Sequence, residues 1–211
     1  MVGSLITFEG IDGSGKSTQI KMLENELYKL GVEYKTFREP GGTELSEMIR
    51  AILLDKENIE LISTAESLLF AAARAQLTAE QIKPAIAKGD FVICDRFTDS
   101  TIAYQGYGRG LDIKKLEAIN HIATAGLTPD ITFILDIAPE VAAERIEADS
   151  PDRMEATGID FFRRIREGYR DIKDQDPNRY RVINGEQSSE NVFKDIKKIV
   201  MERFEEVLTC S

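Results

Sequence analysis

A glycine-rich stretch, GIDGSGKST at positions 10–18, constrains the fold more than any other feature of this chain. Its spacing follows the pattern G-x-x-x-x-G-K-[ST], in which backbone N–H groups surround a phosphate. The preceding residues, Leu5 to Glu9, have the β-branched and aromatic character of a strand. The following residues repeat apolar side chains at helical spacing: Ile20, Leu23, Leu27 and Leu30. The stretch predicts a strand, a phosphate-binding loop and a helix; the alternative is a plain glycine turn between the two elements.

The loop residues have distinct expected roles in binding a nucleotide. Lys16 is expected to reach the β- and γ-phosphates, and Ser17 to offer its hydroxyl to Mg²⁺. The positive end of the helix dipole favours the same anion. Thr18 is either a weaker phosphate ligand or an ordinary first-turn residue. Asp12 either meets a metal, its waters or a sugar hydroxyl, or only forms the turn. The candidate ATP-binding residues are Gly10, Ile11, Asp12, Gly13, Ser14, Gly15, Lys16, Ser17 and Thr18.

Strand and helix patterns alternate along the whole chain. Helical patterns separate the strands, and a break is expected near Leu77–Lys83 because Pro84 disfavours a helical residue before it. Alternation implies right-handed crossovers and a mostly parallel sheet. The sequence therefore predicts one α/β domain over residues 1–211, with three layers and helices on both sheet faces. The expected strands are Leu5–Glu9, Glu33–Arg38, Phe91–Asp95, Ile131–Asp136 and Tyr180–Ile183.

Composition narrows the class of protein. The 211 residues suffice for one α/β domain, and the net charge of −10 disfavours a nucleic-acid polymer as a partner. The apolar runs are too short to span a membrane, and the first residues lack the pattern of a secretory signal. Cys94 and Cys210 form no C-x-x-C pattern, which disfavours a disulfide framework or a zinc site. We therefore expect a cytoplasmic protein with no membrane or nucleic-acid partner.

Polar residues at the ends of two further strands are candidate ligands. Asp95 ends an apolar run, where open α/β sheets bind ligands, and is a candidate for holding Mg²⁺ or its waters. The alternative is an Asp that caps the next helix. Arg96 is a candidate donor to a second phosphate because a planar guanidinium binds oxyanions through two N–H groups, although alone it could be a surface arginine. Arg38 enters the loop FREPGGTE and could also meet a phosphate.

Phe70 and Arg74 lie four residues apart on one predicted helix face, within LLFAAARAQ. An aromatic ring beside a cation suits a stacked base whose carbonyl accepts a hydrogen bond. Periodicity alone favours the other interpretation, in which Phe70 is a core residue. His121, the only histidine, is interpreted as structural or solvent-facing, and Cys94 as a buried strand residue.

Six segments together resemble the bacterial-type thymidylate kinases, and they occur in the same order: FEGIDGSGKST, REPGGT, LLFAAARAQ, DRFTDSTIAYQGYGRG, LTPDITFILD and DRMEATGIDFF. The similarity covers nearly the whole chain, and REPGGT with DR…S…AYQG…RG is far more specific than the phosphate loop. It implies ATP-dependent phosphorylation of dTMP to dTDP with Mg²⁺. It also implies the P-loop NTPase fold of the nucleoside monophosphate kinases, with a five-stranded parallel sheet and commonly a homodimer.

The resemblance also implies roles for single residues on the acceptor side. Arg38 and Arg96 match the arginines that bind the monophosphate. Arg74 matches the arginine that serves thymine, and Phe70 matches the aromatic residue that stacks on it. Asp12 matches the loop acid near the deoxyribose 3′-hydroxyl.

Further acceptor-side roles come from the segment STIAYQGYGRG. Tyr104, which is expected to follow a short apolar turn, matches the tyrosine that disfavours a 2′-hydroxyl. Gln105 matches a polar neighbour of the nucleotide. Either Ser100 or Thr101 is expected to approach the pyrimidine edge.

One position departs from part of that family. Some members carry an arginine directly after the loop acid, where this chain has Gly13, and members that lack it supply the charge from a mobile lid. The lid expected here, at about 140–157, contains only Arg145 and Arg153. Arg153 is preferred because it lies in the matching DRME; the alternative is a surface helix and turn of mixed charge.

The expected chemistry is in-line attack by a dTMP phosphate oxygen on the γ-phosphorus of ATP. The expected catalytic residues are Lys16, Arg96 and Arg153, and the expected metal ligands are Ser17 and Asp95. Two other functions stay open: a kinase for another nucleotide or a nucleoside, and a nucleotide-dependent switch. A switch would call for a guanine-specifying N-K-x-D motif, which the sequence lacks.

Overall fold

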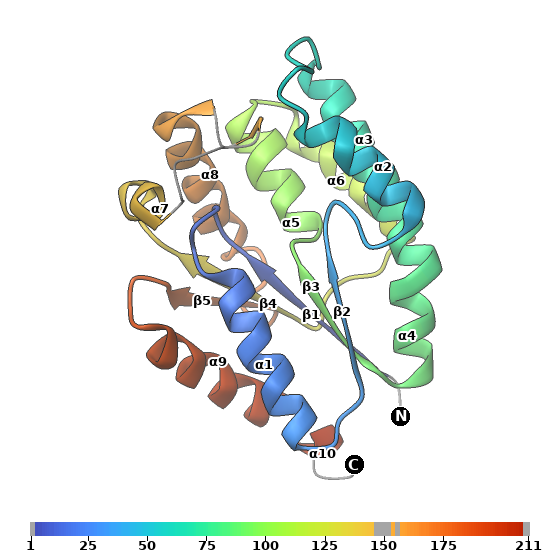
Figure 1. Ribbon diagram of the computed structural model, residues 1–211, viewed down its shortest axis with the longest axis vertical. Helices are drawn as coiled ribbons and strands as arrows, with labels where there is room; N and C mark the ends of the chain where they lie inside the picture. The colour runs from blue at the N-terminus through green and yellow to red at the C-terminus, as the bar shows by residue number, and fades with distance from the viewer. Residues whose placement is uncertain (1–2, 146–152, 155–156, 209–211) are drawn as a thin grey trace.

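A five-stranded sheet lies at the centre of the computed structural model, which describes residues 3–145, 153–154 and 157–208 (Figure 1). The strands lie in the order β2-β3-β1-β4-β5, and every neighbouring pair is parallel. The predicted strands and the α/β class are confirmed, with strand ends that differ by one residue at most. The strands are β1 (Ser4–Glu9), β2 (Tyr34–Arg38), β3 (Phe91–Asp95), β4 (Ile131–Asp136) and β5 (Tyr180–Asn184).

Helices cover both faces of this sheet, as predicted. Helices α1 and α9 pack together on one face (Figure 1). On the opposite face, η2 packs against both α6 and α8. In the described residues, no helix is long and apolar enough to cross a bilayer. The α-helices are α1 (Lys16–Lys29), α2 (Glu44–Leu54), α3 (Ser63–Leu77), α4 (Lys83–Lys88), α5 (Thr98–Thr101), α6 (Ile113–Thr124), α7 (Pro139–Arg145), α8 (Ile159–Ile172), α9 (Ser189–Arg203) and α10 (Glu205–Leu208), and the π-helices are η1 (Thr78–Ile82) and η2 (Ile102–Gly108).

Alternation of side chains along the strands decides what reaches each face. In β1, Ile6 and Phe8 join the core cluster beneath α1 and α9, and in β3 Ile93 joins the same cluster. Glu9 follows the opposite alternation and points toward the face that η2 and α8 cover. Asp95 lies two residues after Ile93 in β3, so its side chain is on the same face as that of Ile93 and points toward α1. Glu9 and Asp95, at the ends of neighbouring strands, therefore lie on opposite faces of the sheet.

The predicted interruption of the long helical region is a change of helix type. Helix α3 ends at Leu77, five residues of π-helix follow, and α4 begins at Lys83. Pro84 occupies the first turn of α4, where its missing N–H costs least. The helical backbone thus continues through Leu77–Lys83, and Lys83 is helical although Pro84 follows it, so the expected break is only a change in the hydrogen-bond pattern of the helix.

The residues before Tyr104 are helical, and the expectation of a short turn there is wrong. Helix α5 continues directly into η2, which packs closely against α8. A Cβ atom at Gly108 would lie 2.6 Å from a ring carbon of Phe161, and one at Gly168 would lie 2.7 Å from the ring of Tyr107. Glycine is required at both positions because the two helices approach so closely. The glycines that suggested a turn instead allow this helix packing.

Candidate active site

The predicted loop joins β1 to α1, and Lys16 folds back over it. The Lys16 Nζ donates to the carbonyl oxygens of Gly10 at 3.1 Å and Ile11 at 3.2 Å. Lys16 is 6% exposed. Burial and the neighbouring Arg96 lower the pKa of Lys16, whereas nearby acids oppose that shift. The ammonium group is therefore held at the loop by neutral carbonyl groups, which a phosphate oxygen can replace.

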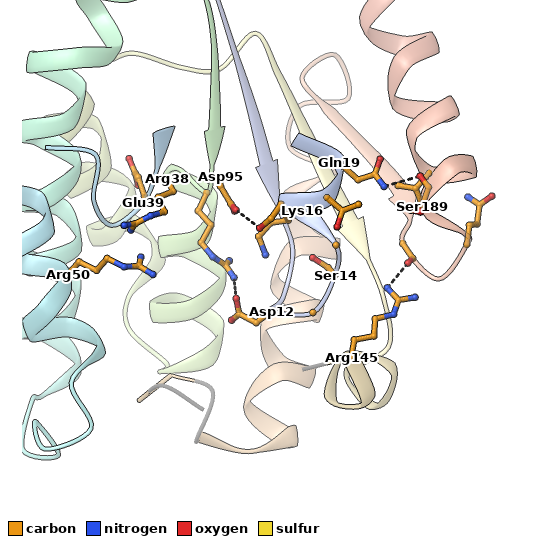
Figure 2. A pocket seen from close by; sticks show the side chains of 18 residues that line it. Asp12, Ser14, Lys16, Gln19, Arg38, Glu39, Arg50, Asp95, Arg145 and Ser189 are labelled. Atoms are coloured by element: carbon orange, nitrogen blue, oxygen red, sulfur yellow. Dashed lines mark hydrogen bonds and ion pairs between the residues drawn. The ribbon is translucent and has the colours of Figure 1, made fainter. Parts of the chain in front are cut away.

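A cavity of about 680 Å³ opens at this loop. Figure 2 shows Asp12 and Lys16 on the loop, Arg145 and Ser189 on one side, and Arg38 and Arg50 on the other. Cations outnumber acids in its lining, which favours binding of a polyanion. The cations are Lys16, Arg38, Arg50, Arg96 and Arg145, and the acids are Asp12, Glu39 and Asp95.

A smaller cavity of about 100 Å³ adjoins the first. The two share a wall that includes Asp12 and Arg96. The smaller cavity brings together all the predicted acceptor-side residues except Arg38, which lines the larger cavity. The predicted residues that line the smaller cavity are Asp12, Phe70, Arg74, Arg96, Ser100, Thr101, Tyr104 and Gln105.

Arg96 forms a closed triangle with Asp12 and Tyr104 in the shared wall. The Arg96 Nη2 lies 2.6 Å from Asp12 Oδ1 and 2.9 Å from the Tyr104 hydroxyl, which donates to Asp12 Oδ2 at 3.0 Å. Burial alone would raise the pKa of Asp12, but Arg96 and Lys16 lower it to about 2. Asp12 is therefore ionised at neutral pH and holds the guanidinium in the wall between the two cavities.

Arg74 is 1% exposed, and its guanidinium is bonded by the protein on every side. Its Nε and Nη2 meet Glu39 Oε2, its Nη1 donates to Thr101 and Asn120, and its Nη2 also donates to the Phe97 carbonyl. A hydrogen bond from Arg74 to a base would replace one of these contacts. Without such an exchange, Arg74 shapes the smaller cavity by fixing its walls.

Ser17 and Asp95 meet at the edge of the larger cavity, as their predicted metal roles require. The Ser17 hydroxyl donates to Asp95 Oδ2 at 3.3 Å. A hydroxyl and a carboxylate are hard oxygen donors of the kind that Mg²⁺ accepts beside phosphate oxygens and waters.

Comparison with known proteins names the family. A family model described as "Thymidylate kinase" matches residues 8–196. This chain belongs to the thymidylate kinase family. The thymidylate kinase of Chlorobium luteolum is 49% identical over 212 residues, covering 96% of this chain and 99% of the relative. That of Caldanaerobacter subterraneus is 48% identical over 202 residues, covering 96% and 97%. The resemblance read from the sequence is confirmed.

A solved structure agrees with the fold. The crystal structure of thymidylate kinase from Ehrlichia chaffeensis superposes with a TM-score of 0.77 at 36% identity, covering 95% of this chain and 99% of that chain. The predicted P-loop NTPase fold is therefore confirmed.

The two arginines of the expected thymidylate kinase lid lie in different places. Arg145 lines the larger cavity, and its Nη1 donates to the Gly185 carbonyl at 2.9 Å. Arg153 is absent from the described linings of both cavities, and its Nη2 lies 2.7 Å from Glu66 Oε2. The remainder of the expected lid, residues 146–152 and 155–156, lies outside the described residues. The catalytic role of Arg153 stays a prediction.

Two residues of the shared wall escaped the sequence analysis. Glu39 is buried, lines both cavities, and has an Oε1 atom without a hydrogen-bond partner in the described part of the chain. Its place inside REPGGT was a usable signal. Arg50 lines both cavities and donates to the Pro40 carbonyl at 3.0 Å. Nothing in the pattern of α2 distinguishes Arg50 from a solvent-facing arginine.

Proposed function

We propose that this chain transfers the γ-phosphoryl group of ATP to dTMP, giving ADP and dTDP. The observation that carries the proposal is the pair of adjoining cavities, one at the phosphate loop and one lined by the acceptor-side residues. Their shared wall, with Arg96 and Asp12, is where a donor and an acceptor phosphate would meet. Membership of the thymidylate kinase family supports dTMP as the acceptor.

The chemistry is attack by an acceptor phosphate oxygen on the γ-phosphorus, with departure of ADP. That oxygen is already anionic at neutral pH, so no side chain has to remove a proton. The task of the protein is to bring two polyanions together in line. Lys16 offsets charge on the donor phosphates, and Arg96 binds the acceptor phosphate. Arg38 and Arg50 add positive charge to the lining of the larger cavity, which also includes Arg96.

Phe70 and Arg74 form the base-binding wall in this proposal, and Tyr104 disfavours a 2′-hydroxyl. Phe70 lines the smaller cavity beside Arg74, four residues along the same helix. Tyr104 is 6% exposed and is fixed by its bonds to Asp12 and Arg96, so its ring forms a rigid wall.

Mg²⁺ is the expected metal, and Ser17 with Asp95 would hold it or its waters. Among the described residues, no group of three or more His, Cys, Asp or Glu side chains could hold a metal ion. The phosphate oxygens of ATP would therefore complete the coordination, as is usual for Mg²⁺. When bound, the ion neutralises negative charge on the donor phosphates.

We also propose a homodimer formed through α2, α3 and α6. Helix α2 packs against α3, and α3 packs against α6. Each of the three helices carries exposed apolar side chains, and exposed apolar surface is a feature of protein interfaces. These are Leu45, Met48 and Ile52 on α2, Leu68 on α3 and Ile122 on α6.

ADP release measured with a panel of nucleoside monophosphates, ATP and Mg²⁺ tests the proposed reaction. We expect the highest kcat/KM with dTMP and loss of turnover with a chelator of divalent cations. A higher value with another monophosphate or a nucleoside would favour the alternative kinase. ADP release that is slow and independent of any acceptor would favour a nucleotide-dependent switch.

A further inference from the structure

Glu66 lies on the helix face that also supplies the wall of the smaller cavity. Glu66, Phe70 and Arg74 follow one another at four-residue spacing along α3, so they lie on one side of the helix. Phe70 and Arg74 line the cavity. Glu66 lies one turn further along the same face, and its side chain is 1% exposed. A carboxylate buried so completely requires partners of opposite charge or hydrogen-bond donors.

The partners of Glu66 come from two other segments. Gln105, in η2, donates from Nε2 to Glu66 Oε1 at 2.9 Å. Arg109, just after η2, donates from Nε and Nη2 to both carboxylate oxygens at 3.3 Å. Arg153 approaches Glu66 Oε2 with its Nη2 at 2.7 Å. One carboxylate of α3 therefore ties η2 to the chain at 153–154.

These ties reach the smaller cavity. Gln105 and Met154 both line it, and the Met154 sulfur lies 3.5 Å from Arg109 Nη2 and 3.7 Å from Arg153 Nη2. Arg153 Nε also donates to the carbonyl of Leu53, at the end of α2, at 2.8 Å. The next residue of α2, Leu54, lines the cavity as well.

The position of this wall indicates which part of the acceptor it would contact. In the described linings, Leu54, Gln105 and Met154 belong to the smaller cavity and not to the phosphate cavity. Asp12 and Arg96 belong to both. The wall that Glu66 holds is therefore at the end away from the phosphates, where the nucleoside of the acceptor would lie.

We propose that Glu66 is a positioning residue for the nucleoside end of the acceptor site. It orients Gln105 and holds the chain at 153–154 against α2, without contacting substrate itself. The inference rests on the proposed function, because dTMP is the acceptor it assumes. Glu66 therefore contributes to the affinity for dTMP, and the affinity for ATP does not depend on it.

Glu66→Gln tests the proposal because it keeps the shape of the side chain and removes its charge. The charge-assisted contacts with Arg109 and Arg153 are lost, which loosens Gln105 and Met154. We expect the KM and Kd of dTMP to rise about tenfold or more, with those of ATP within about twofold of wild type. The measurements are steady-state kinetics with each substrate varied and calorimetric titration with dTMP alone.

A matched control is Glu26→Gln, which removes an ion pair with Lys197 at 2.7 Å between α1 and α9, outside both cavities and outside the expected lid. We expect wild-type KM values for both substrates. A merely structural role of Glu66 predicts a different result, in which the fraction of active enzyme falls and both KM values stay unchanged. Circular dichroism and thermal unfolding show whether each variant is folded.

Arg109→Gln keeps the proposal testable if Glu66→Gln does not fold, since Arg109 is partly exposed. It should raise the KM of dTMP selectively, by a smaller factor. In the double variant the two effects should be less than multiplicative, because both act through one contact. Equal weakening of dTMP and ATP, or unchanged dTMP affinity in folded variants, would overturn the role of Glu66. Failure of the wild-type protein to phosphorylate dTMP would instead overturn the proposed function.

Discussion

Arg96 has a backbone conformation that side chains rarely adopt. Its φ of 70° lies in the left-handed region, at a cost of about 1–3 kcal/mol for a residue other than glycine. The structure compensates through several contacts. The Arg96 N–H donates to the Phe8 carbonyl at 2.9 Å, and Nη1 donates to the Gly10 carbonyl at 3.0 Å. The strained turn thus aims the guanidinium into the wall between the two cavities.

Replacing Arg96 should weaken acceptor binding far more than ATP binding. Arg96→Ala would remove the proposed charge-assisted contact with the acceptor phosphate, which should cost about 1.5–3 kcal/mol, or roughly ten- to more than a hundredfold in the Kd of dTMP. Arg96→Gly removes the same contact and also relieves the backbone strain, so it should be the more stable variant with equally weak dTMP binding. Titration calorimetry and thermal unfolding measure the two effects. Equal loss of ATP and dTMP affinity in Arg96→Ala would contradict this assignment.

Lys16→Ala should abolish most phosphoryl transfer and leave the fold intact. The Lys16 ammonium donates to two backbone carbonyls, and Asp12 keeps its ion pair with Arg96 when Lys16 is removed. Without the positive charge of Lys16 beside the phosphates of ATP, kcat should fall by about 10²-fold or more. Lys29→Ala, which removes an exposed lysine from the other end of α1, is the control. Near wild-type turnover in folded Lys16→Ala protein would refute the role of the loop.

At the scale of elements, the sequence predicted what depends on local pattern. Strands such as Phe91–Asp95 were predictable because a short apolar run with turn residues at both ends is typical of a buried strand. The helical state of 98–108 was not, because the segment contains Gly106 and Gly108, which favour loops in isolation. Its π-helical form depends on packing against α8, which is distant in sequence. Tertiary contact overrode local propensity here.

Glu9 connects strand β1 to the start of α5. Phe97 precedes α5 and, as an apolar residue, offers no capping oxygen. The Glu9 carboxylate accepts the N–H groups of Phe97 at 2.7 Å and Ser100 at 3.3 Å, and the hydroxyl of Tyr169 at 2.8 Å. A strand-end acid thus caps a helix 90 residues or so away in sequence, a role that no local pattern reveals.

Glu9 should make stability depend on pH between its unfolded and folded pKa values. Burial, aided by Asp99 and opposed by Arg96, Ser100 and Tyr169, raises the pKa of Glu9 from 4.5 to about 7. Between these values the folded state keeps a proton that the unfolded state releases. The contribution of Glu9 to the free energy of unfolding is therefore full below pH 4.5. It decreases as the pH rises through the folded pKa of about 7.

Urea unfolding at pH 5, 6, 7 and 8 checks this expectation. Glu9→Gln cannot ionise, so its stability relative to the wild type should increase from pH 5 to pH 7 and then level off. The change in this stability difference with pH does not depend on any pH-independent loss of stability that the substitution causes. Parallel stability curves for the two proteins would show that Glu9 does not titrate in this range.

At the scale of the whole molecule, an acidic protein presents a cation-rich cavity. The net charge is −10, yet the larger cavity has more cations than acids in its lining. Sequence analysis could predict Lys16 and Arg96 because they lie within recognisable motifs. It could not predict Arg50 or the tie made by Glu66, because both depend on how α2 and α3 pack beside the sheet. Contiguous motifs revealed most cavity residues, and the contacts that hold those residues in place required the structure.

The proposed dimer places α2, α3 and α6 against the same helices of a second copy. Met48 is 62% exposed on α2, between Leu45 and Ile52, so a charge there would be buried in the interface without a partner. We expect the wild type to have twice the mass of one chain by size-exclusion chromatography with light scattering, and Met48→Asp to shift toward the monomer. Tyr28→Asp, at an apolar position that is 77% exposed on α1, should stay dimeric. A wild-type monomer would contradict the dimer, and a dimeric Met48→Asp variant would place the interface on other helices.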